Sequence, residues 1–324
     1  MNYKRLSLGI PVYNQSSTIT ETIKSALSQT VPFDEIIVVD NHSTDGTTEQ
    51  LKVFQDQIRV VSPHRHLGMV ANWNYCINQM DAEWFSLLSG DDLLKPGFAM
   101  AIKQAIADHP TAALVRTDWD VIDGDGVVRS VHQQMSVSRT TAPPKTWQEQ
   151  LNGPKVSFAA FAARRDLWQH VGGFPDSFHL FQDWMFWLKL APLGEFVRVP
   201  ASLAQYRSHP RPELERKRAR LRLMDEYRYT TEMLPALPWQ GAGKGSKIKT
   251  LRQRRLTDLL NYLVHYQAEI QDKESQEMLK TMAEVSGMAH IYNAWCINHQ
   301  PIAAPWGQRL VSGLKTMVRR SVSS

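Results

Sequence analysis

The stretch LLSGDDLLKP, residues 87–96, decides how this chain is interpreted. Two apolar residues, typical of the end of a buried strand, run directly into the adjacent acids Asp91 and Asp92. Each carboxylate disfavours the ionisation of the other. Something in the folded protein must therefore offset this repulsion at the point where the strand leaves the core.

The residues before this stretch alternate strand and helix patterns. Short apolar runs predict buried strands at residues 5–10, 35–40, 58–61 and 84–88. Helical patterns lie between them, at residues 18–30, 47–54 and 69–80. Thr18 and Glu21 have the spacing of a capping box at the start of the first helix. Repeated β-α units favour an α/β fold with a mostly parallel sheet covered by helices on both faces.

The pattern changes beyond Pro96. A helix is expected up to Asp108, and two strands are then expected to meet at DGDG, residues 123–126, in an antiparallel hairpin. From Arg211 onward the sequence is helical and charged, with a Pro- and Gly-rich break at residues 234–246.

Composition places the chain among ordinary soluble proteins. It has 324 residues, 43% of them hydrophobic and 21% charged. No apolar run reaches the length of a membrane span, and the N-terminal residues pass directly into a strand pattern, so we expect a cytoplasmic protein. The two cysteines, Cys76 and Cys296, are too few for a disulfide framework and are expected in the core.

Charge is distributed unevenly along the chain. Residues 207–324 hold 20 Lys and Arg against 11 Asp and Glu, a net charge of +9, whereas residues 1–206 carry −4. A basic segment of this kind fits nucleic acid, an anionic membrane surface or an anionic acceptor equally well.

Unusual side chains follow three of the predicted strands. Tyr13 follows the first, Asp40 the second, and Asp91 with Asp92 the fourth. Ligands of open α/β sheets bind beyond the carboxyl ends of the strands, so these residues are candidates for one site. Each also has a structural alternative, because Tyr13 could pack, Asp40 could serve a turn, and the acid pair could cap the next helix.

Together these segments resemble family 2 glycosyltransferases of the GT-A fold. The resemblance rests on IPVYN (10–14), VVDNHSTDGT (38–47), HLGMVANWN (66–74), LLSGDDLLKP (87–96), FQDWMFWLKL (181–190) and YRSHP (206–210). They occur in the order typical of the family and cover about residues 5–210. The resemblance implies a Rossmann-like mixed, mostly parallel sheet with helices on both faces.

The resemblance also implies a domain organisation. Residues 1–210 would form the glycosyltransferase domain, with a nucleotide-binding half at 1–100 and an acceptor half at 101–210. Residues 211–324 would form a basic helical extension that the resemblance does not cover.

In this family the paired acids serve a nucleotide-sugar. By resemblance, Asp91 would bind the ribose and Asp92 would help to hold Mn²⁺ or Mg²⁺ against the diphosphate. A hard cation prefers carboxylate and phosphate oxygens, so it would offset the repulsion between the two acids. It would also stabilise the charge on the departing nucleoside diphosphate.

Other cofactor-binding residues follow from the same resemblance. Pro11, Val12 and Tyr13 would line the base pocket, and Asp40 would accept a hydrogen bond from the base. Gly68 would permit a tight turn near the nucleotide, with Asn72 reaching toward it. The alternative for the segment Asn72–Asn74 is a helix with a buried tryptophan and two solvated amides.

A hydroxyl acceptor needs a general base, and the resemblance assigns this role to Asp183, at the first turn of an apolar helix. Gln182 stands where the family has a glutamate. His209 would reach the metal or the diphosphate, although a lone histidine after a strand is otherwise a surface residue, and Arg207 could neutralise phosphate charge. The loop from Gly172 to Leu180 would cover the acceptor, with its aromatic rings stacking on a sugar.

Near the end, residues 306–320 form an amphipathic basic helix pattern. Such a helix can lie in a membrane interface, which would place the protein at the inner face of a membrane and favour a lipid-linked acceptor. The alternative is a terminal helix docked on its own domain.

Other function classes fit less well. A dehydrogenase needs a Gly-rich turn after its first strand, and a nucleotidyltransferase needs a Gly-rich basic loop there, whereas residues 9–18 supply neither. The sequence therefore predicts an inverting, metal-dependent transferase that moves a sugar from a nucleotide donor, with UDP favoured, to a hydroxyl of a glycan or lipid-linked acceptor in surface glycan synthesis. No nucleic-acid partner is predicted. A nucleotidyltransferase of similar fold and a non-catalytic nucleotide- or glycan-binding protein remain the alternatives.

Overall fold

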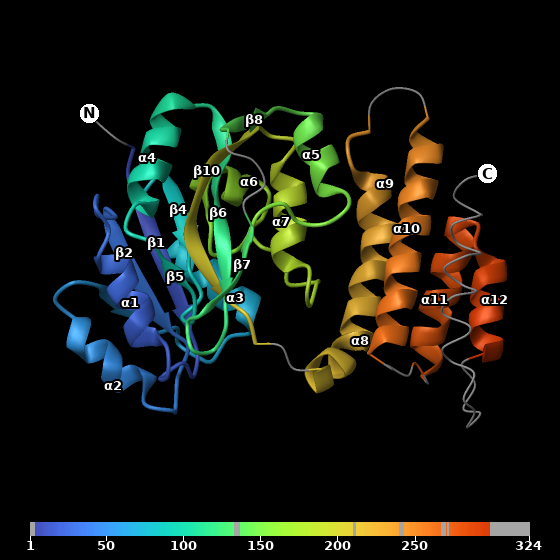
Figure 1. Ribbon diagram of the computed structural model, residues 1–324, viewed down its shortest axis with the longest axis horizontal. Coiled ribbons are helices and arrows are strands. Elements are labelled where there is room, and N and C mark those ends of the chain that lie inside the picture. The colour runs from blue at the N-terminus through green and yellow to red at the C-terminus, as the bar shows by residue number, and fades with distance from the viewer. Residues whose placement is uncertain are drawn as a thin grey trace. The chain divides into compact units, whose positions relative to one another are not determined.

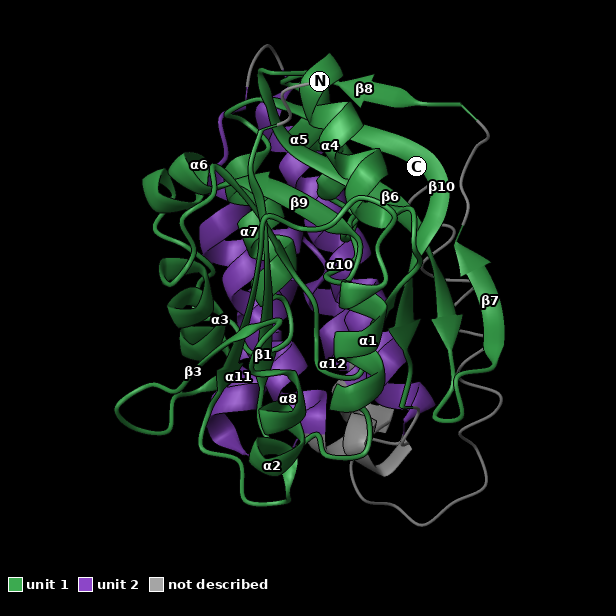
Figure 2. Cartoon of the chain, turned by 90° about the vertical axis from the view of Figure 1, so that its left-hand side faces the viewer, with its two compact units in different colours: residues 1–210 green, residues 211–324 purple. Residues whose placement is uncertain are grey.

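The computed structural model describes residues 4–132, 137–209, 212–239, 243–266, 270 and 272–298. The chain divides into two compact units, residues 1–210 and residues 211–324 (Figure 2). The amphipathic segment predicted at residues 306–320 lies outside the described residues.

Unit 1 is built on one mixed sheet, ten-stranded within the described residues (Figure 1). Its strands are β1 (Leu6–Val12), β2 (Glu35–Asp40), β3 (Arg59–Val61), β4 (Trp84–Leu87), β5 (Leu93–Leu94), β6 (Ala112–Ile122), β7 (Val128–His132), β8 (Arg139–Thr141), β9 (Phe161–Arg164) and β10 (Glu195–Arg207). The order is β3-β2-β1-β4-β9-β6-β10-β5, with β7 beside β6 and β8 beside β10.

The sheet combines two parallel regions. Strands β3, β2, β1 and β4 run parallel to one another, and β6 runs parallel to β10. Strand β9 joins the two regions by pairing antiparallel with both β4 and β6. The prediction of a mixed α/β sheet is therefore confirmed, and the sheet continues without a break from the first hundred residues into the second.

Helices cover both faces of this sheet. They are α1 (Ile19–Leu27), α2 (Thr47–Leu51) with the 3-10 turn η1 (Lys52–Phe54), α3 (Met69–Asn78), α4 (Phe98–Asp108), α5 (Lys145–Gln150), α6 (Arg165–His170) and α7 (Gln182–Leu190). Apolar side chains of α1, α2 and α4 share one core cluster with the sheet. Aromatic rings of α3, α6 and α7 pack together on the other face, where Phe174 lies 4.2 Å from Phe186 and 5.6 Å from Trp73.

Close approach explains the glycine in β1. A Cβ atom at Gly9 would collide with Met80 and with Cys76, the latter on α3. The absence of a side chain therefore lets α3 lie directly on the strand. Cys76 is buried there as expected, whereas the side chain of Cys296 lies outside the described part of the chain.

The capping box predicted at the start of α1 is wrong. The hydroxyl of Thr18 donates to the carbonyl oxygen of Gly90 at 2.8 Å, and the carboxylate of Glu21 accepts from Arg207 at 2.8 Å. Both side chains therefore hold segments that are distant in sequence, and neither caps its own helix.

The hairpin predicted around residues 123–126 is present. Strands β6 and β7 pair antiparallel, with Asp120 opposite Val131. The Asp123 carboxylate accepts from the backbone N–H of Asp125 and Val127, and Gly126 has φ of 81°, a left-handed conformation that favours glycine.

The described residues of unit 2 are mostly helical, as predicted. It contains α8 (Pro212–Arg228), the π-helical turn η2 (Tyr229–Met233), α9 (Leu234–Ala236), α10 (Lys244–His265), α11 (Lys273–Ser286) and α12 (Ala289–Asn298). A core that includes Leu223, Leu259 and Leu279 holds it together, and Arg255 pairs with the fully buried Glu226. Among the described residues, no helix of the protein has both the length and the apolar character to cross a membrane.

Candidate nucleotide-sugar site

The carboxyl ends of three strands meet at one edge of the sheet. In the parallel register Val12 lies opposite Asp40, and Gly9 lies opposite Leu87. Since β1 has β2 on one side and β4 on the other, the residues that follow these strands lie close to one another. This is the arrangement predicted from the sequence.

Two non-glycine residues at this edge have left-handed backbones. Asn14, after β1, has φ of 54°, and His42, after β2, has φ of 64°. The backbone N–H of Asn14 donates to the hydroxyl of Ser43, and its side-chain oxygen accepts from the backbone N–H of Thr44. The two loops are thus tied together in sparsely populated conformations, which cluster at functional sites. The sequence analysis did not single out either residue.

The aromatic ring of Tyr13 is accessible to a ligand. Its side chain is 48% exposed, and its ring lies 4.6 Å from that of His66 in an edge-on arrangement. His66 is held in turn by a 3.0 Å contact between Nδ1 and the carbonyl oxygen of Asn41. By contrast, Pro11 is buried and Val12 is 1% exposed with its side chain in the core. Of the three residues predicted to line a base pocket, Tyr13 is the one whose side chain is open to a ligand.

Asp40 is buried and hydrogen-bonded within its own loop. One oxygen accepts from the backbone N–H of Ser43 at 3.0 Å and the other from the hydroxyl of Thr48 at 2.5 Å. These are the turn contacts given above as the structural alternative. The contact of Asp40 with a base stays a prediction.

Gly68 does not form the tight turn expected of it. Its φ of −63° and ψ of 159° are extended, a conformation open to any residue. No atom lies within 4 Å of the position that a Cβ would take, so the start of α3 borders open space.

Asn72 and Asn74, in the first turns of α3, have separate roles. Asn72 is 4% exposed, and its Oδ1 has no hydrogen-bond partner within the described residues. Such an orphaned buried acceptor is rare and calls for a donor from elsewhere. Asn74 holds the backbone N–H and carbonyl of Phe174 at 2.9 and 2.8 Å. The alternative of two solvated amides is therefore wrong.

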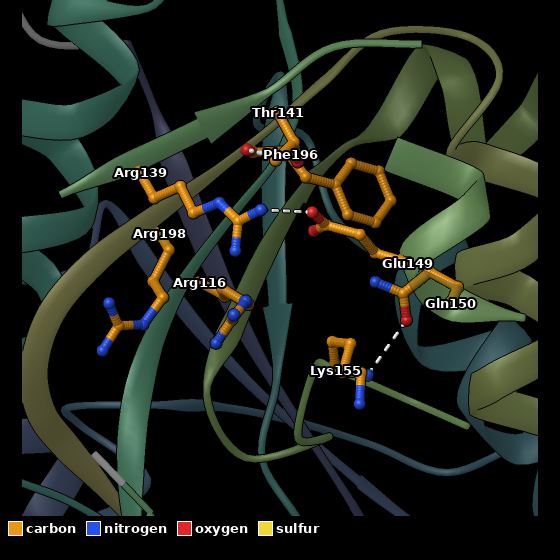
Figure 3. Close-up of a pocket in the computed structure, with 8 residues that line it drawn as sticks. All are labelled: Arg116, Arg139, Thr141, Glu149, Gln150, Lys155, Phe196 and Arg198. Atoms are coloured by element: carbon orange, nitrogen blue, oxygen red, sulfur yellow. Dashed lines mark hydrogen bonds and ion pairs between the residues drawn. The ribbon is translucent and has the colours of Figure 1, made fainter. Parts of the chain in front are cut away.

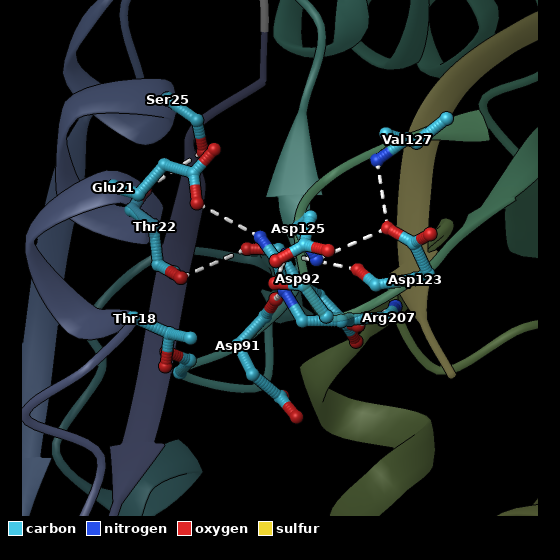
Figure 4. Close-up of polar contacts among 12 residues, drawn as sticks. Thr18, Glu21, Thr22, Ser25, Asp91, Asp92, Asp123, Asp125, Val127 and Arg207 are labelled. Carbon is cyan, nitrogen blue, oxygen red and sulfur yellow. Dashed lines mark hydrogen bonds and ion pairs between the residues drawn. The ribbon is translucent and has the colours of Figure 1, made fainter. Parts of the chain in front are cut away.

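The adjacent acids after β4 differ in environment. Asp92 is 2% exposed, and one of its oxygens accepts from the backbone N–H of Arg207 at 2.8 Å. Burial, and after it the charge of Asp91, raise the pKa of Asp92 well above its usual range. Asp91 is half-buried, and its Oδ2 lies 3.0 Å from Nε2 of His209. Figure 4 shows Asp91 projecting away from the contacts around Arg207.

Arg207 holds the loop that carries these acids. Its Nε donates to the carbonyl oxygen of Asp91 at 2.8 Å, and its Nη1 donates to the carbonyl oxygens of Asp123 and Gly124 at 3.0 and 2.9 Å. Its Nη2 donates to the Glu21 carboxylate at 2.8 Å (Figure 4). The prediction that this arginine neutralises phosphate is wrong, because the buried guanidinium is committed to the protein itself.

The residues present fit a divalent cation that a substrate helps to coordinate. The Asp91 carboxylate and the His209 imidazole meet at 3.0 Å and are both accessible to solvent. The described residues contain no cluster of three or more His, Cys, Asp or Glu side chains that could hold a metal without help. One or two protein ligands together with substrate phosphates are the usual arrangement for Mg²⁺.

Asp183 lies on a different element, at the start of α7. Its Oδ1 accepts from the backbone N–H of Trp184 at 2.6 Å, and burial raises the pKa of its carboxyl to about 6. Gln182 beside it is buried. Within the described residues, no hydrogen bond or ion pair joins Asp183 to Asp91, Asp92 or His209. A carboxyl with this pKa can accept a proton near neutral pH.

The loop before α7 differs from expectation in one respect. Gly172 and Gly173 have φ of 77° and 75°, so the predicted bend is present. The rings of Phe174 and Phe178, however, are only 2% and 9% exposed. They pack in the core and offer no face to a sugar, so that prediction is wrong.

Comparison with known proteins identifies the family of this chain. Residues 7–172 match the family Glycosyl transferase family 2. An uncharacterized protein of Mycobacterium tuberculosis is 27% identical over 71% of this chain and 75% of its own length. An uncharacterized glycosyltransferase of Haemophilus influenzae is 23% identical over 64% of this chain and 67% of its own.

Solved structures resemble the fold. Crystal structures of S. aureus TarS 1-349 in complex with UDP and with UDP-GlcNAc superpose with TM-scores of 0.61 and 0.60. Each has 16% sequence identity to this chain, and each match covers 91% of this chain and 88% of the other. The fold is therefore GT-A-like. Because the family match spans about half of the sequence, this chain belongs to glycosyltransferase family 2.

Proposed function

We propose that this glycosyltransferase moves a sugar from a UDP-sugar to a hydroxyl acceptor with inversion at the anomeric carbon. The observation that carries the proposal is the meeting of Asp91 and His209 at 3.0 Å, beside the sheet edge that also holds Tyr13. The UDP and UDP-GlcNAc complexes of S. aureus TarS, which has the same fold, support the choice of nucleotide.

In this proposal the donor lies across the carboxyl ends of β1, β2 and β4. The exposed ring of Tyr13 stacks on the base, and the buried carboxylate of Asp40 remains an acceptor for it. The orphaned Oδ1 of Asn72 accepts a hydrogen bond from an N–H or O–H group of the nucleotide-sugar. Open space at Gly68 leaves room for the sugar diphosphate near the start of α3.

Asp91 and His209 are proposed to hold Mn²⁺ or Mg²⁺ with the diphosphate, and the buried Asp92 lies next to Asp91 in the same loop. When bound, such a cation stabilises the negative charge of the leaving nucleoside diphosphate. The predicted ribose contact of Asp91 also stays part of the proposal. Arg207 acts only by positioning, because it fixes the carbonyl of Asp91 and the carboxylate of Asp92.

Asp183 is proposed as the general base. It takes the proton of the acceptor hydroxyl as the oxygen attacks the anomeric carbon from the side opposite the leaving diphosphate. Its pKa of about 6 leaves most of the carboxyl ionised at neutral pH and still basic enough to receive the proton. We propose a glycan or lipid-linked acceptor in surface polysaccharide or glycoconjugate synthesis.

The experiment is a panel of nucleotide-sugars incubated with the full-length protein and Mn²⁺ or Mg²⁺, with release of the nucleotide as the readout. UDP-sugars should be turned over fastest, and chelation of the metal should stop the release. Equal turnover of GDP- and UDP-sugars would contradict the choice of nucleotide. Undiminished turnover after chelation would contradict the metal.

A further inference from the structure

A basic cavity of about 340 Å³ is lined by none of the site residues discussed above (Figure 3). Its walls come from β6, β8, α5, β10 and the segment after α5. The lining residues are Arg116, Arg139, Thr141, Glu149, Gln150, Lys155, Phe196 and Arg198. This volume falls within the range of small-molecule sites.

Positive charge dominates the cavity. Four of the eight lining residues are basic and one, Glu149, is acidic. Arg139 forms an ion pair with Glu149, and Arg198 donates to the fully buried Asp118, with 2.8 Å between Nε and Oδ1. Arg116 lies 3.8 Å from the same Asp118. Two acids thus face four cations.

The pKa of Arg116 reflects the positive electrostatic potential of the cavity. Its side chain is 11% exposed. Burial, followed by repulsion from Arg198, lowers the pKa of Arg116 to about 10, in spite of the opposing effect of Asp118. An anion in the cavity would relieve this repulsion, since guanidinium groups bind oxyanions through charge-assisted hydrogen bonds.

The arrangement of the lining residues indicates which anion binds and what kind of molecule it belongs to. The four cations come from separate segments, and Arg139 and Lys155 lie on different sides of Arg116 (Figure 3). This arrangement suits the several oxygens of a phosphate rather than one planar carboxylate. Phe196 offers an apolar ring, while Thr141 and Gln150 offer polar groups beside it. We propose that this cavity binds a phosphate group carried on a sugar or polyol.

A hydrogen bond links the wall of the cavity to α7, the helix that carries the proposed base. The carbonyl oxygen of Gln150 accepts from the indole N–H of Trp184 at 2.6 Å, and Trp184 follows Asp183 directly. A phosphate-bearing occupant therefore lies next to the first turn of α7. It is either part of the acceptor or a separate small molecule, and the first of these readings rests on the function proposed above.

Direct binding tests the proposal without any requirement for activity. Inorganic phosphate and glycerol 3-phosphate are titrated into the protein at low salt by calorimetry, with glycerol as the neutral control. Both phosphates should bind, glycerol should not, and added salt should weaken binding because it screens the charges.

A double variant, Arg139→Ala with Lys155→Ala, removes the two most exposed cations and should raise Kd about tenfold or more. The control is Arg59→Ala, because the side chain of Arg59 is 44% exposed and paired with one acid, as is that of Arg139. Absence of binding to the unaltered protein, or an equal Kd in the double variant and the control, would overturn the proposal.

Product analysis distinguishes the two sources of the phosphate. With UDP-GlcNAc present, a glycosylated glycerol phosphate detected by mass spectrometry would identify the occupant as acceptor. A changed rate of UDP release without such a product would identify it as a separate effector. In either case the response should disappear in the double variant, and a response that persists there would overturn the assignment to this cavity. If no donor is turned over, the proposed function fails, whereas the binding measurement still decides the cavity.

Discussion

The two acidic regions of this glycosyltransferase are built in opposite ways. The loop of Asp91 and Asp92 is held by Arg207, Thr18 and Thr22, which reach it from β10 and α1. Asp183 instead has a local contact, in which its carboxylate accepts from the backbone N–H of its neighbour Trp184. A carboxyl pKa is raised in both regions. Burial and then the charge of Asp91 raise that of Asp92, whereas burial raises that of Asp183 against backbone hydrogen bonds that lower it.

This difference indicates two kinds of chemistry. Two adjacent acids held in a fixed loop repel each other, and a bound cation relieves that repulsion. A single acid with a pKa of about 6 can gain and lose a proton in each reaction cycle. Variants that alter one region and leave the other intact can therefore separate the two roles.

The largest effect is expected from Asp183→Asn. The amide cannot accept the proton, so kcat for sugar transfer should fall about 10³-fold, within the range of general-base catalysis. Steady-state transfer assays check this. Asp166→Asn, which alters an acid in the first turn of the neighbouring helix α6, should leave kcat unchanged. Normal turnover by Asp183→Asn would remove this residue from the mechanism.

Arg207→Met should affect folding and donor binding together. It leaves the carbonyl oxygens of Asp91, Asp123 and Gly124 without their donor, so the free energy of unfolding should fall by about 3 kcal/mol. Urea unfolding measures this loss. The control Arg129→Met removes an arginine whose side chain is 64% exposed and should cost under about 0.5 kcal/mol. Equal losses in both variants would mean that Arg207 does not hold the loop.

Asp91→Asn should weaken Mn²⁺-dependent binding of UDP about tenfold, since the accessible carboxylate beside His209 loses its charge. Asp92→Asn should weaken it less, because Asp92 is 2% exposed and an amide oxygen can still accept from Arg207. Calorimetric titration with and without Mn²⁺ compares the two. A larger loss of UDP binding in Asp92→Asn than in Asp91→Asn would mean that Asp92 makes the main metal contact, as the sequence resemblance implies.

The pH dependence of sugar transfer should follow the protonation of Asp183. Because its pKa is raised to about 6, the base is ionised above that pH and protonated below it. The value of kcat/KM should therefore fall about tenfold for each pH unit below 6 and level off above it. A profile that stays flat down to pH 4.5 would show that no group of this pKa takes part.

The smallest effect is expected from Glu21→Gln. The Glu21 side chain is 56% exposed, so its ion pair with Arg207 should contribute less than about 1 kcal/mol. Thermal unfolding and UDP binding should both stay close to those of the unaltered protein. A loss as large as that of Arg207→Met would show that the ion pair, rather than the backbone contacts, holds the loop.

Local patterns predicted much of the fold and the site. Alternating β-α units, the hairpin at residues 123–126 and the acids after β4 are all encoded in short segments, and the structure contains each of them. Strand ends come together by the rules of parallel sheets, so Tyr13, Asp40 and Asp91 could be grouped before any coordinates were known.

Long-range contacts could not be predicted in this way. Arg207 meets Glu21 from 186 positions away, and Asn74 meets Phe174 from 100, so their roles depend on tertiary packing. The basic cavity likewise combines residues of β6, β8, α5, β10 and the segment after α5, whose charges look unremarkable in the sequence. Burial of Phe174 and Phe178 was missed because an aromatic loop can face either solvent or core.

In the proposed mechanism Asp91 binds the donor, and Asp183 takes the proton of the acceptor. Titration of UDP with Mn²⁺ into Asp183→Asn and into Asp91→Asn separates these two roles. We predict that Asp183→Asn binds UDP with the Kd of the unaltered protein, while Asp91→Asn binds it about tenfold more weakly. Equal weakening in both variants would contradict the separation of roles between the two acidic regions.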